Sequence, residues 1–285
     1  MKDLKDKVAA ITGAASGIGR ALAVGLAEEG CHIAISDVNE SGLKETAGMI
    51  GNGIVRVSTH VVDVANLEHV KRYASEVIKT HKGVHLLINN AGVTAIDTIE
   101  DVSYDDLKWL MGINLWGVIY GCKEFLPYLK QQNEAHIVNI SSVNGIFTNP
   151  NNGAYCTSKF AVRGFTETLC QEMKATKVKV SCVHPGGIRT NILRNARFHK
   201  VPDTSLGKEE TVRLFDRFLA HTSADKAARI IISGIKKNKH RIMVGPDAYV
   251  CDWLKRLFPV NFQKMISNKK VSLRMKKKIG SGEKD

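Results

Sequence analysis

The feature that most constrains the fold is a regular alternation of short apolar segments with longer segments of helical pattern. The strand-like segments are 7–12, 32–37, 53–63, 84–89, 136–141, 178–185 and 241–245. The helical segments between them are 17–29, 41–50, 67–80, 105–129 and 154–175. Alternation at these lengths predicts a parallel sheet with helices on both faces. Several strand segments are almost continuously apolar, as expected for strands that are covered on both sides.

The domain organisation follows from the length and from one break in this rhythm. A chain of 285 residues with 44% hydrophobic residues suits one α/β domain with a full core. Residues 191–222 show no clear strand pattern, and a long irregular segment inside a compact domain is usually functional. It follows the sixth strand, at the sheet edge where such folds bind ligands. We therefore predict a catalytic domain over 1–246, with a substrate loop and its helix at 191–222.

The remaining residues, 247–285, form a basic C-terminal extension. The chain has a net charge of +13, but residues 236–285 hold 14 Lys and Arg against 4 Asp and Glu, so the first 235 residues carry only +3. The body has no basic stripe and no known nucleic-acid-binding motif, and nucleic acid is not expected as a partner.

The extension also contains aromatic residues at helical spacing. In "DAYVCDWLKRLFPVNFQKMI" (247–266), apolar residues recur at intervals of three and four residues; they are Tyr249, Val250, Trp253, Leu254, Leu257 and Phe258. Three interpretations stay open. Residues 247–278 could contact an anionic membrane surface peripherally, the helix could cover the substrate site or contact another subunit, or the extension could be a solvated appendage.

The cellular location is constrained by three absences in the sequence. No run of about 18 apolar residues is present, and the N-terminus lacks the apolar core of a secretory signal. The six cysteines are scattered without a C-x-x-C pair, which favours neither a disulfide framework nor a metal site. We expect a cytoplasmic protein, associated peripherally with a membrane if the extension acts there, and no bound metal.

A glycine-rich turn joins the first strand to the first helix. In "ITGAASGIGRAL" (11–22), Gly13, Gly17 and Gly19 allow a tight turn and close approach of a pyrophosphate to the helix N-terminus. Asp37 ends the next strand, where an acid can bind the adenosine ribose hydroxyls and repel a 2′-phosphate. Alone, Asp37 could instead be a helix N-cap. Together the glycines and the acid predict a dinucleotide site that favours NAD over NADP.

A phenol and an amine lie one helical turn apart in "GAYCTSKFAV" (153–162). Residues at i and i+4 share a helix face, so Tyr155 and Lys159 point the same way. A phenol with a pKa of about 10 is a poor base near neutrality, and a nearby cation lowers that pKa. Taken singly, each residue also has a structural interpretation, as a core aromatic or a solvated charge.

Six motifs in order carry a family resemblance. They are "TGAASGIG" (12–19), "NNAG" (89–92), Asn114 in "GINLWG", Ser142 in "NISSVNG", "YCTSK" (155–159) and "PGGIRT" (185–190). Over about residues 5–190 the chain resembles the short-chain dehydrogenase/reductase family. The resemblance implies a single doubly wound Rossmann domain with a seven-stranded parallel sheet. It also implies hydride transfer between NAD(P) and an alcohol or carbonyl.

The resemblance assigns roles to four catalytic residues. Tyr155 would be the general acid/base, and Lys159 would lower its pKa and hold the nicotinamide ribose. Ser142, rather than the adjacent Ser141, would orient the substrate oxygen. Asn114 would hold a helix kink and a water that relays protons. It also implies a homodimer or homotetramer built through the long helices.

The cofactor would be NAD, with NADP disfavoured. Its binding residues, transferred from the motifs, are Gly13, Ser16, Gly17, Ile18, Gly19, Asp37, Asp63, Val64, Asn90, Ala91, Gly92, Tyr155, Lys159, Pro185, Gly186, Ile188 and Thr190. His184 precedes Pro185 and is a weaker candidate for contact with the cofactor or substrate. The remaining histidines considered, His60, His69, His81, His85 and His136, are interpreted as surface or strand-edge residues, and Cys156 as a core residue.

The predicted substrate is a hydrophobic alcohol or ketone, because the candidate lining is apolar. That lining comprises Ile192, Leu193, Ala196, Phe198, Val201, Leu206, Leu214 and Phe215, with Ile96, Val143, Asn144 and Phe147 from elsewhere. The cations Arg189, Arg194, Arg197 and Lys200 leave open an anionic group on the substrate. Two alternatives remain: an NADP-dependent reductase of ketoacyl or lipid carbonyl compounds, and a cofactor-bound, membrane-associated scaffold with little turnover.

Overall fold

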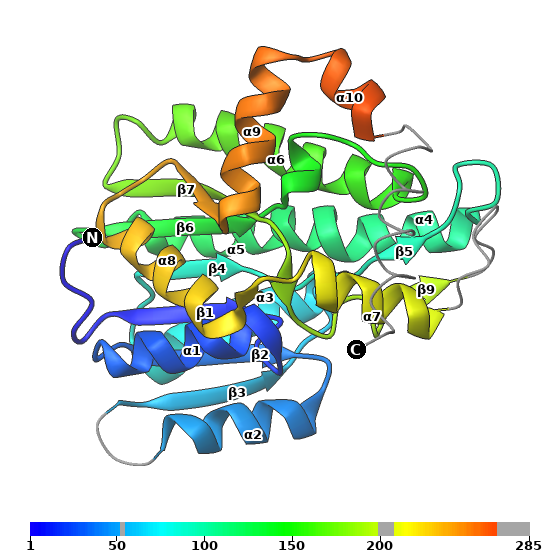
Figure 1. Cartoon of the computed structure of the whole chain (residues 1–285). Coiled ribbons are helices and arrows are strands. Elements are labelled where there is room, and N and C mark those ends of the chain that lie inside the picture. The colour runs from blue at the N-terminus through cyan, green and yellow to red at the C-terminus, as the bar shows by residue number, and fades with distance from the viewer. Residues whose placement is uncertain (52–54, 199–207, 267–285) are drawn as a thin grey trace, which may run out of the picture.

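A seven-stranded parallel sheet forms the centre of the molecule. The computed structural model describes residues 1–51, 55–198 and 208–266 (Figure 1). The sheet order is β11-β7-β6-β4-β1-β2-β3, and every pairing in it is parallel. The strands are β1 (Val8–Thr12), β2 (His32–Asp37), β3 (Val57–Val61), β4 (Leu86–Asn89), β6 (Ala135–Ile140), β7 (Val178–Pro185) and β11 (Arg241–Val244). The predicted doubly wound α/β fold with seven strands is confirmed.

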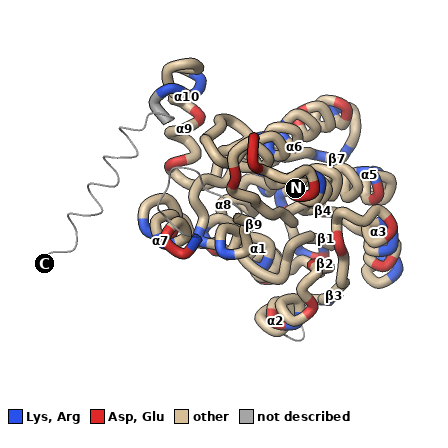
Figure 2. The backbone as a smooth tube through the Cα atoms, turned by 90° about the vertical axis from the view of Figure 1, so that its right-hand side faces the viewer, with Lys and Arg blue, Asp and Glu red and all other residues tan. Residues whose placement is uncertain are grey.

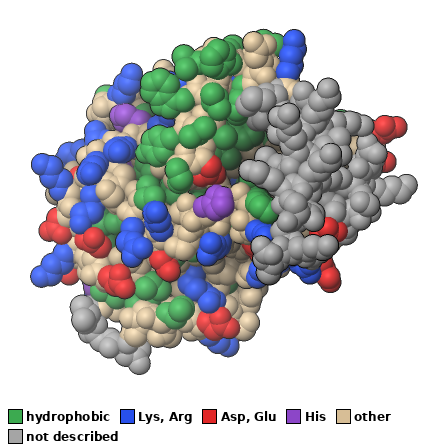
Figure 3. All heavy atoms as spheres, in the orientation of Figure 1, with side chains coloured by type: hydrophobic (Ala, Val, Ile, Leu, Met, Phe, Trp, Pro, Cys, Tyr) green, Lys and Arg blue, Asp and Glu red, His purple; other side chains and the backbone are tan. Residues whose placement is uncertain are grey.

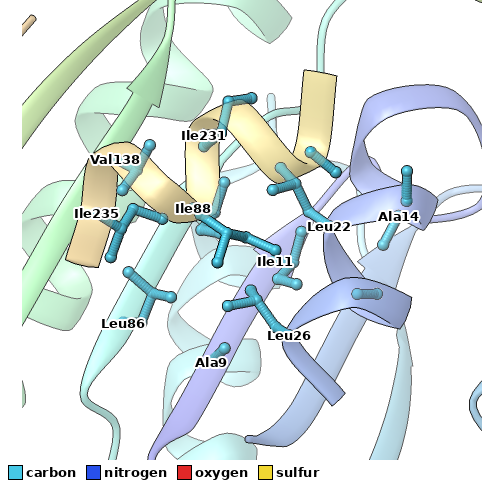
Figure 4. Close-up of a cluster of buried hydrophobic side chains, with 14 of the residues drawn as sticks. Ala9, Ile11, Ala14, Leu22, Leu26, Leu86, Ile88, Val138, Ile231 and Ile235 are labelled. Atoms are coloured by element: carbon cyan, nitrogen blue, oxygen red, sulfur yellow. The ribbon is translucent and has the colours of Figure 1, made fainter. Parts of the chain in front are cut away.

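Helices cover both faces of this sheet. One face carries α1 (Gly17–Glu28), α2 (Glu40–Ile50) and α8 (Ala224–Lys236), and the other carries α3 (Leu67–His81), α5 (Gly117–Leu129) and α6 (Gly153–Glu172). On the first face Leu22 and Leu26 of α1 and Ile231 of α8 pack over Ile11 and Ile88 of the sheet (Figure 4). Successive strand residues point to opposite faces, so Leu87 contributes to the other cluster.

The segment 105–129, predicted as one helix, is divided by a turn of π-helix. The elements are α4 (Tyr104–Met111), the π-helix η1 (Gly112–Trp116) and α5. Asn114 lies within η1 and is fully buried. π-Turns inside α-helices occur frequently at functional sites.

The segment 191–222 contains the helix expected there and, in addition, short strands that its sequence does not indicate. Its described part holds β9 (Arg197–Phe198), the helix α7 (Lys208–Phe218) and the start of β10 (Thr222–Ser223). β9 pairs with β5 (Ala95–Ile96), and β10 pairs with β8 (Ile188–Arg189). Two-residue strands are too short to leave a periodic pattern, which explains why they were not predicted. Three residues named for this loop, Lys200, Val201 and Leu206, lie outside the described residues.

The described part of the extension is helical, with α9 (Pro246–Leu257) followed by α10 (Asn261–Ile266). Both project at the end of the molecule opposite α2 (Figures 1 and 2). Throughout the part of the chain that the structure describes, no helix combines the length and hydrophobicity needed to cross a membrane.

Two histidine predictions are wrong. His136 and His81 are buried, not at the surface. His136 donates to or accepts from Ser181 at 2.7 Å, and His81 pairs with Ser58 at 2.8 Å. The partners come from strands or helices distant in sequence, so no local pattern reveals them. Cys156 is buried, as predicted.

Candidate active site

The predicted motifs converge at the carboxyl edge of the sheet. The chain leaves β1 toward β2 and β3 and then returns to β4 on the other side of β1. Crossover connections diverge at such a point, and the crevice between them is where open α/β sheets bind ligands. The glycine turn follows β1, "NNAG" follows β4, Ser142 follows β6, and Gly186 follows β7.

The glycine turn is held against the segment after β4. Asn90 Nδ2 donates to the Thr12 and Gly13 carbonyls at 3.0 and 3.1 Å. In return, the Thr12 hydroxyl accepts from the Asn90 and Ala91 amides at 3.0 and 3.1 Å. A Cβ on Gly19 would lie 2.2 Å from the Gly13 carbonyl oxygen, so this turn cannot hold a side chain there.

The backbone of the turn is suited to an anion. Gly13 and Gly17 have φ values of +67° and +55°, which favour glycine. Ser16 is the N-cap of α1, its side chain makes no capping bond, and the first turn of α1 carries no acid. The N-terminal amides of this helix therefore provide a favourable site for a phosphate.

Asp37 is not the N-cap of α2. That role belongs to Asn39, whose side chain accepts from the Gly42 amide at 3.0 Å. The Asp37 carboxylate accepts instead from the Ala15 and Asn39 amides, at 3.1 and 3.0 Å. The half-buried Asp37 carboxylate is thus fixed beside the glycine turn, at the position where the sequence predicts a contact with the adenosine ribose.

The remaining predicted cofactor residues come from the segments after β3 and β7 and from the start of α1. Asp63 is exposed after β3 and accepts from the Ala65 amide at 2.9 Å, and Val64 beside it is buried. A Cβ on Gly17 would lie 3.2 Å from Thr190, so the glycine turn and the segment after β7 come together there. Ile188 is buried in β8, and Ile18 is half-buried at the start of α1.

The turn after Pro185 is tied to two C-terminal elements. The Gly186 amide donates to the Val244 carbonyl at 2.9 Å, and the Gly187 amide donates to the Asp247 carboxylate at 2.7 Å. Asp247 is in the first turn of α9. This contact was not predicted, because no sequence signal relates residue 247 to a turn some 60 residues earlier.

Tyr155 and Lys159 lie together in the first turns of α6. The Lys159 ammonium is 5.6 Å from the centre of the Tyr155 ring and donates to the Ile140 carbonyl at 3.0 Å. Burial raises the pKa of the Tyr155 phenol to about 12, opposed in part by a hydrogen bond with Ser142. Burial lowers the pKa of Lys159 to about 8. Both groups are therefore pushed toward their neutral forms in the protein alone.

Gly92 lies close beside this pair. A Cβ added to Gly92 would lie 3.4 Å from both the Lys159 ammonium and the Asn114 amide oxygen. The cradle thus runs from the α1 N-terminus past Gly92 to Lys159. These residues fit a dinucleotide: the N-terminal amides of α1 would hold its pyrophosphate, and Tyr155 and Lys159 would act at its reactive end.

Asn114 is fixed by side-chain bonds. Its amide exchanges two hydrogen bonds with the Val93 backbone, at 2.8 and 2.9 Å, and donates to the Ser158 hydroxyl at 3.1 Å. Ser158 in turn donates to the Tyr155 carbonyl at 2.7 Å. Ser158, which was not predicted, therefore links η1 to the helix that carries Tyr155.

Ser142 and Ser141 differ in what their hydroxyls contact. Ser141 donates to the Lys159 carbonyl at 2.8 Å and is directed into α6. Ser142 accepts from the Asn144 amide at 3.1 Å and is close enough to act on the Tyr155 phenol. His184 is buried with Nδ1 3.0 Å from the Ser142 carbonyl, so its contact with this site runs through the backbone of Ser142.

The arginines of the loop are hydrogen-bonded or ion-paired to other residues of the chain. Arg197 pairs with Asp106 at 2.7 Å and lies 3.7 Å above the Trp109 ring. Arg194 pairs with Asp216 at 2.8 Å. Arg189 donates to the Ala220 carbonyl at 2.9 Å. These three cations therefore have partners within the chain.

Comparison of the chain with known proteins identifies its family. A profile described as short chain dehydrogenase matches residues 7–200. The chain belongs to the short-chain dehydrogenase family. As a member, it is an oxidoreductase enzyme of a family that binds NAD(P), and the predicted family is confirmed. No group of three or more metal-ligating side chains occurs among the residues that the structure describes.

Three relatives show how far this similarity extends. The chain is 39% identical over 269 residues to the putative oxidoreductase SadH of Mycobacterium tuberculosis, covering 94% of this chain and 96% of the relative. It is 29% identical over 282 residues to estradiol 17-beta-dehydrogenase 11 of Homo sapiens, covering 98% and 88%. A short-chain dehydrogenase/reductase of Burkholderia phymatum, solved in complex with NAD, superposes with a TM-score of 0.84 at 29% identity, covering 94% and 98%.

Proposed function

We propose that this short-chain dehydrogenase moves a hydride between NAD and a hydrophobic alcohol or ketone. The observation that carries the proposal is the pairing of half-buried Tyr155 with buried Lys159 beside Gly92, at the end of a cradle that begins at the glycine turn. The bound nicotinamide supplies the hydride chemistry, which protein side chains cannot perform.

Side chains of the protein accept and donate the proton. In the oxidation direction Tyr155 accepts the substrate hydroxyl proton, and in reduction it returns one to the carbonyl oxygen. A phenol with a pKa near 12 needs positive charge nearby to act as a base. Lys159, with a pKa of about 8, is mostly protonated at pH 7 and provides that charge. Ser142 orients the substrate oxygen, and Asn114 with Ser158 holds the start of α6 in place.

The preference for NAD rests on Asp37. Its carboxylate is held by the Ala15 and Asn39 amides at the end of β2. A fixed negative charge there accepts hydrogen bonds from ribose hydroxyls and repels a 2′-phosphate. The solved Burkholderia phymatum relative, at 29% identity, was crystallised with NAD.

Apolar side chains around the loop support a hydrophobic substrate. Ile96 and Ala196 are buried, and Phe198 and Leu193 are half-buried. The neighbouring Arg194 and Arg197 are neutralised by ion pairs, so they favour an uncharged substrate. One relative is named for estradiol, itself a hydrophobic alcohol.

Replacing Tyr155 by phenylalanine tests the proposal. NADH absorbance is followed with alcohols and ketones graded by chain length. We expect Tyr155→Phe to reduce kcat by at least about a hundredfold, the scale of general acid–base catalysis, while NAD affinity changes little. Tyr120→Phe, a half-buried tyrosine of α5, is the matched control and should keep full activity. Normal turnover in Tyr155→Phe would contradict the mechanism.

A further inference from the structure

The outer face of α9 is a strip of exposed apolar side chains. We define the α9 strip as Tyr249, Val250, Trp253 and Leu257, which are 50%, 56%, 64% and 60% exposed. At about 100° per residue these four positions span roughly 100° of the helix. Ala248, on the opposite side, is fully buried, and Asp252 there pairs with Arg241 at 2.7 Å. Helix α9 is thus packed through one side and presents aromatic and aliphatic groups on the other.

The strip is continuous with further apolar surface. Phe258 and Val260, which follow α9, are 52% and 62% exposed. Figure 3 shows hydrophobic side chains gathered over this region at the top of the molecule, with Lys and Arg concentrated to their left. Large exposed apolar patches rimmed by polar residues mark interaction surfaces.

A basic hollow adjoins the strip. It has a volume of about 580 Å³ and lies between α8, β11 and α9, with Tyr249 on its wall. Its cations are Lys226, Arg229, Lys239 and Arg241, and none of the described residues that line it is acidic. Arg241 is paired with Asp252, which leaves Lys226, Arg229 and Lys239 as the exposed charges.

We propose that the α9 strip and the basic hollow together dock the protein on an anionic phospholipid surface. Aromatic residues beside a basic rim are suited to the headgroup boundary of a bilayer. In this arrangement Trp253 and Leu257 enter the acyl boundary, and the hollow takes lipid phosphates. The amino-acid sequence beyond α10 adds 7 Lys and Arg against 2 acids over residues 267–285, which favours the same surface.

The charge distribution argues against a second copy of the chain as the occupant. A two-fold interface brings the same patch of both subunits together. Two copies of the hollow would then bring Lys226, Arg229 and Lys239 near their own counterparts, and like charges across an interface disfavour it. An anionic bilayer satisfies both the strip and the hollow.

Vesicle sedimentation of the full chain tests the proposal. The probes are vesicles of phosphatidylcholine alone and vesicles that also contain phosphatidylserine. The strip variant is Trp253→Gln with Leu257→Gln, and the hollow variant is Lys226→Gln, Arg229→Gln and Lys239→Gln. The matched controls, all at exposed positions away from α9, are Met49→Gln with Tyr104→Gln, and Lys79→Gln with Lys123→Gln and Lys130→Gln.

We expect the wild type and both controls to bind the phosphatidylserine vesicles. The hollow variant should bind about fivefold more weakly for each charge removed, on the order of a hundredfold in all. The strip variant should lose binding to a similar extent. NADH-linked turnover, measured in parallel without vesicles, should stay unchanged and shows that the variants are folded.

Four results would overturn the proposal. The wild type could fail to prefer the phosphatidylserine vesicles, or either variant could bind them as the controls do. The strip variant could instead dissociate an oligomer in sedimentation velocity while vesicle binding persists, which would assign α9 to a subunit contact. Finally, a raised KM for substrate with unchanged vesicle binding would assign it to the substrate site.

Discussion

Lys159, the proposed cationic partner of Tyr155, is buried at a cost to the stability of the fold. Its side chain is buried, and its pKa falls from the usual 10.5 to about 8. Below pH 8 both the folded and unfolded chains hold the proton, so the full penalty of burying the charge acts on the fold. Between pH 8 and 10.5 only the unfolded chain is protonated, and the penalty diminishes as the pH rises.

Replacing this lysine should therefore stabilise the cofactor-free protein. One pKa unit corresponds to about 1.4 kcal/mol, and the lost bond to Ile140 offsets about 1 kcal/mol. We expect Lys159→Met to increase the free energy of unfolding by on the order of 2 kcal/mol at pH 7 while abolishing turnover. Denaturant unfolding at several pH values should show this gain shrinking from pH 8 to 10.5. A gain that grows with pH would contradict the assignment.

Asp37 is the residue that we propose selects NAD over NADP. We expect Asp37→Ser to reduce the ratio of kcat/KM for NAD to that for NADP by on the order of tenfold or more, because the charge that repels a 2′-phosphate is removed. Asp63→Ser, at an exposed carboxylate that is also among the predicted cofactor-binding residues, is the control and should weaken binding of both cofactors alike. An unchanged ratio in Asp37→Ser would exclude the ribose contact.

At the scale of elements, α9 and the turn after β7 are joined by one carboxylate. Asp247 accepts the Gly187 amide at 2.7 Å, and a Cβ on Gly186 would lie 2.1 Å from the same carboxylate. The turn after β7, which we propose holds the nicotinamide end of the cofactor, is therefore held in place by the C-terminal extension. The division proposed at residue 246 separates the elements by sequence, although they are in contact.

Removing that carboxylate should weaken cofactor binding. Leaving a buried amide without its hydrogen-bond acceptor destabilises the structure around it by about 1–3 kcal/mol. We therefore expect Asp247→Ala to raise the KM for NAD on the order of tenfold, with a smaller change in kcat. Steady-state kinetics with NAD varied measure this directly. Asp105→Ala, an exposed acid in the first turn of α4, should match the wild type. Equal KM values for the two variants would make the contact structural only.

The whole molecule is expected to be a homo-oligomer built through its long helices. Trp116 in η1 and Phe160 in α6 are 49% and 38% exposed, which suits a contact between copies. We expect Phe160→Glu to shift the protein toward a smaller species in sedimentation velocity, because an acid would be buried against a partner. Tyr104→Gln, an 82% exposed residue of α4, is the control. An unchanged sedimentation coefficient would place the oligomer contact elsewhere.

The sequence by itself determined the sheet, the order of its helices and the positions of the motif residues. Those features depend on local periodicity and on residues close together in the chain, such as Tyr155 and Lys159. Tertiary structure decided the burial of His81 and His136, the Asp247 contact, and the ion pairs of Arg194 and Arg197. It also turned the α9 strip toward solvent. Each of these outcomes depends on whether a side chain meets a partner from a distant segment, considering only the described residues. Such long-range pairings leave no pattern in the local sequence.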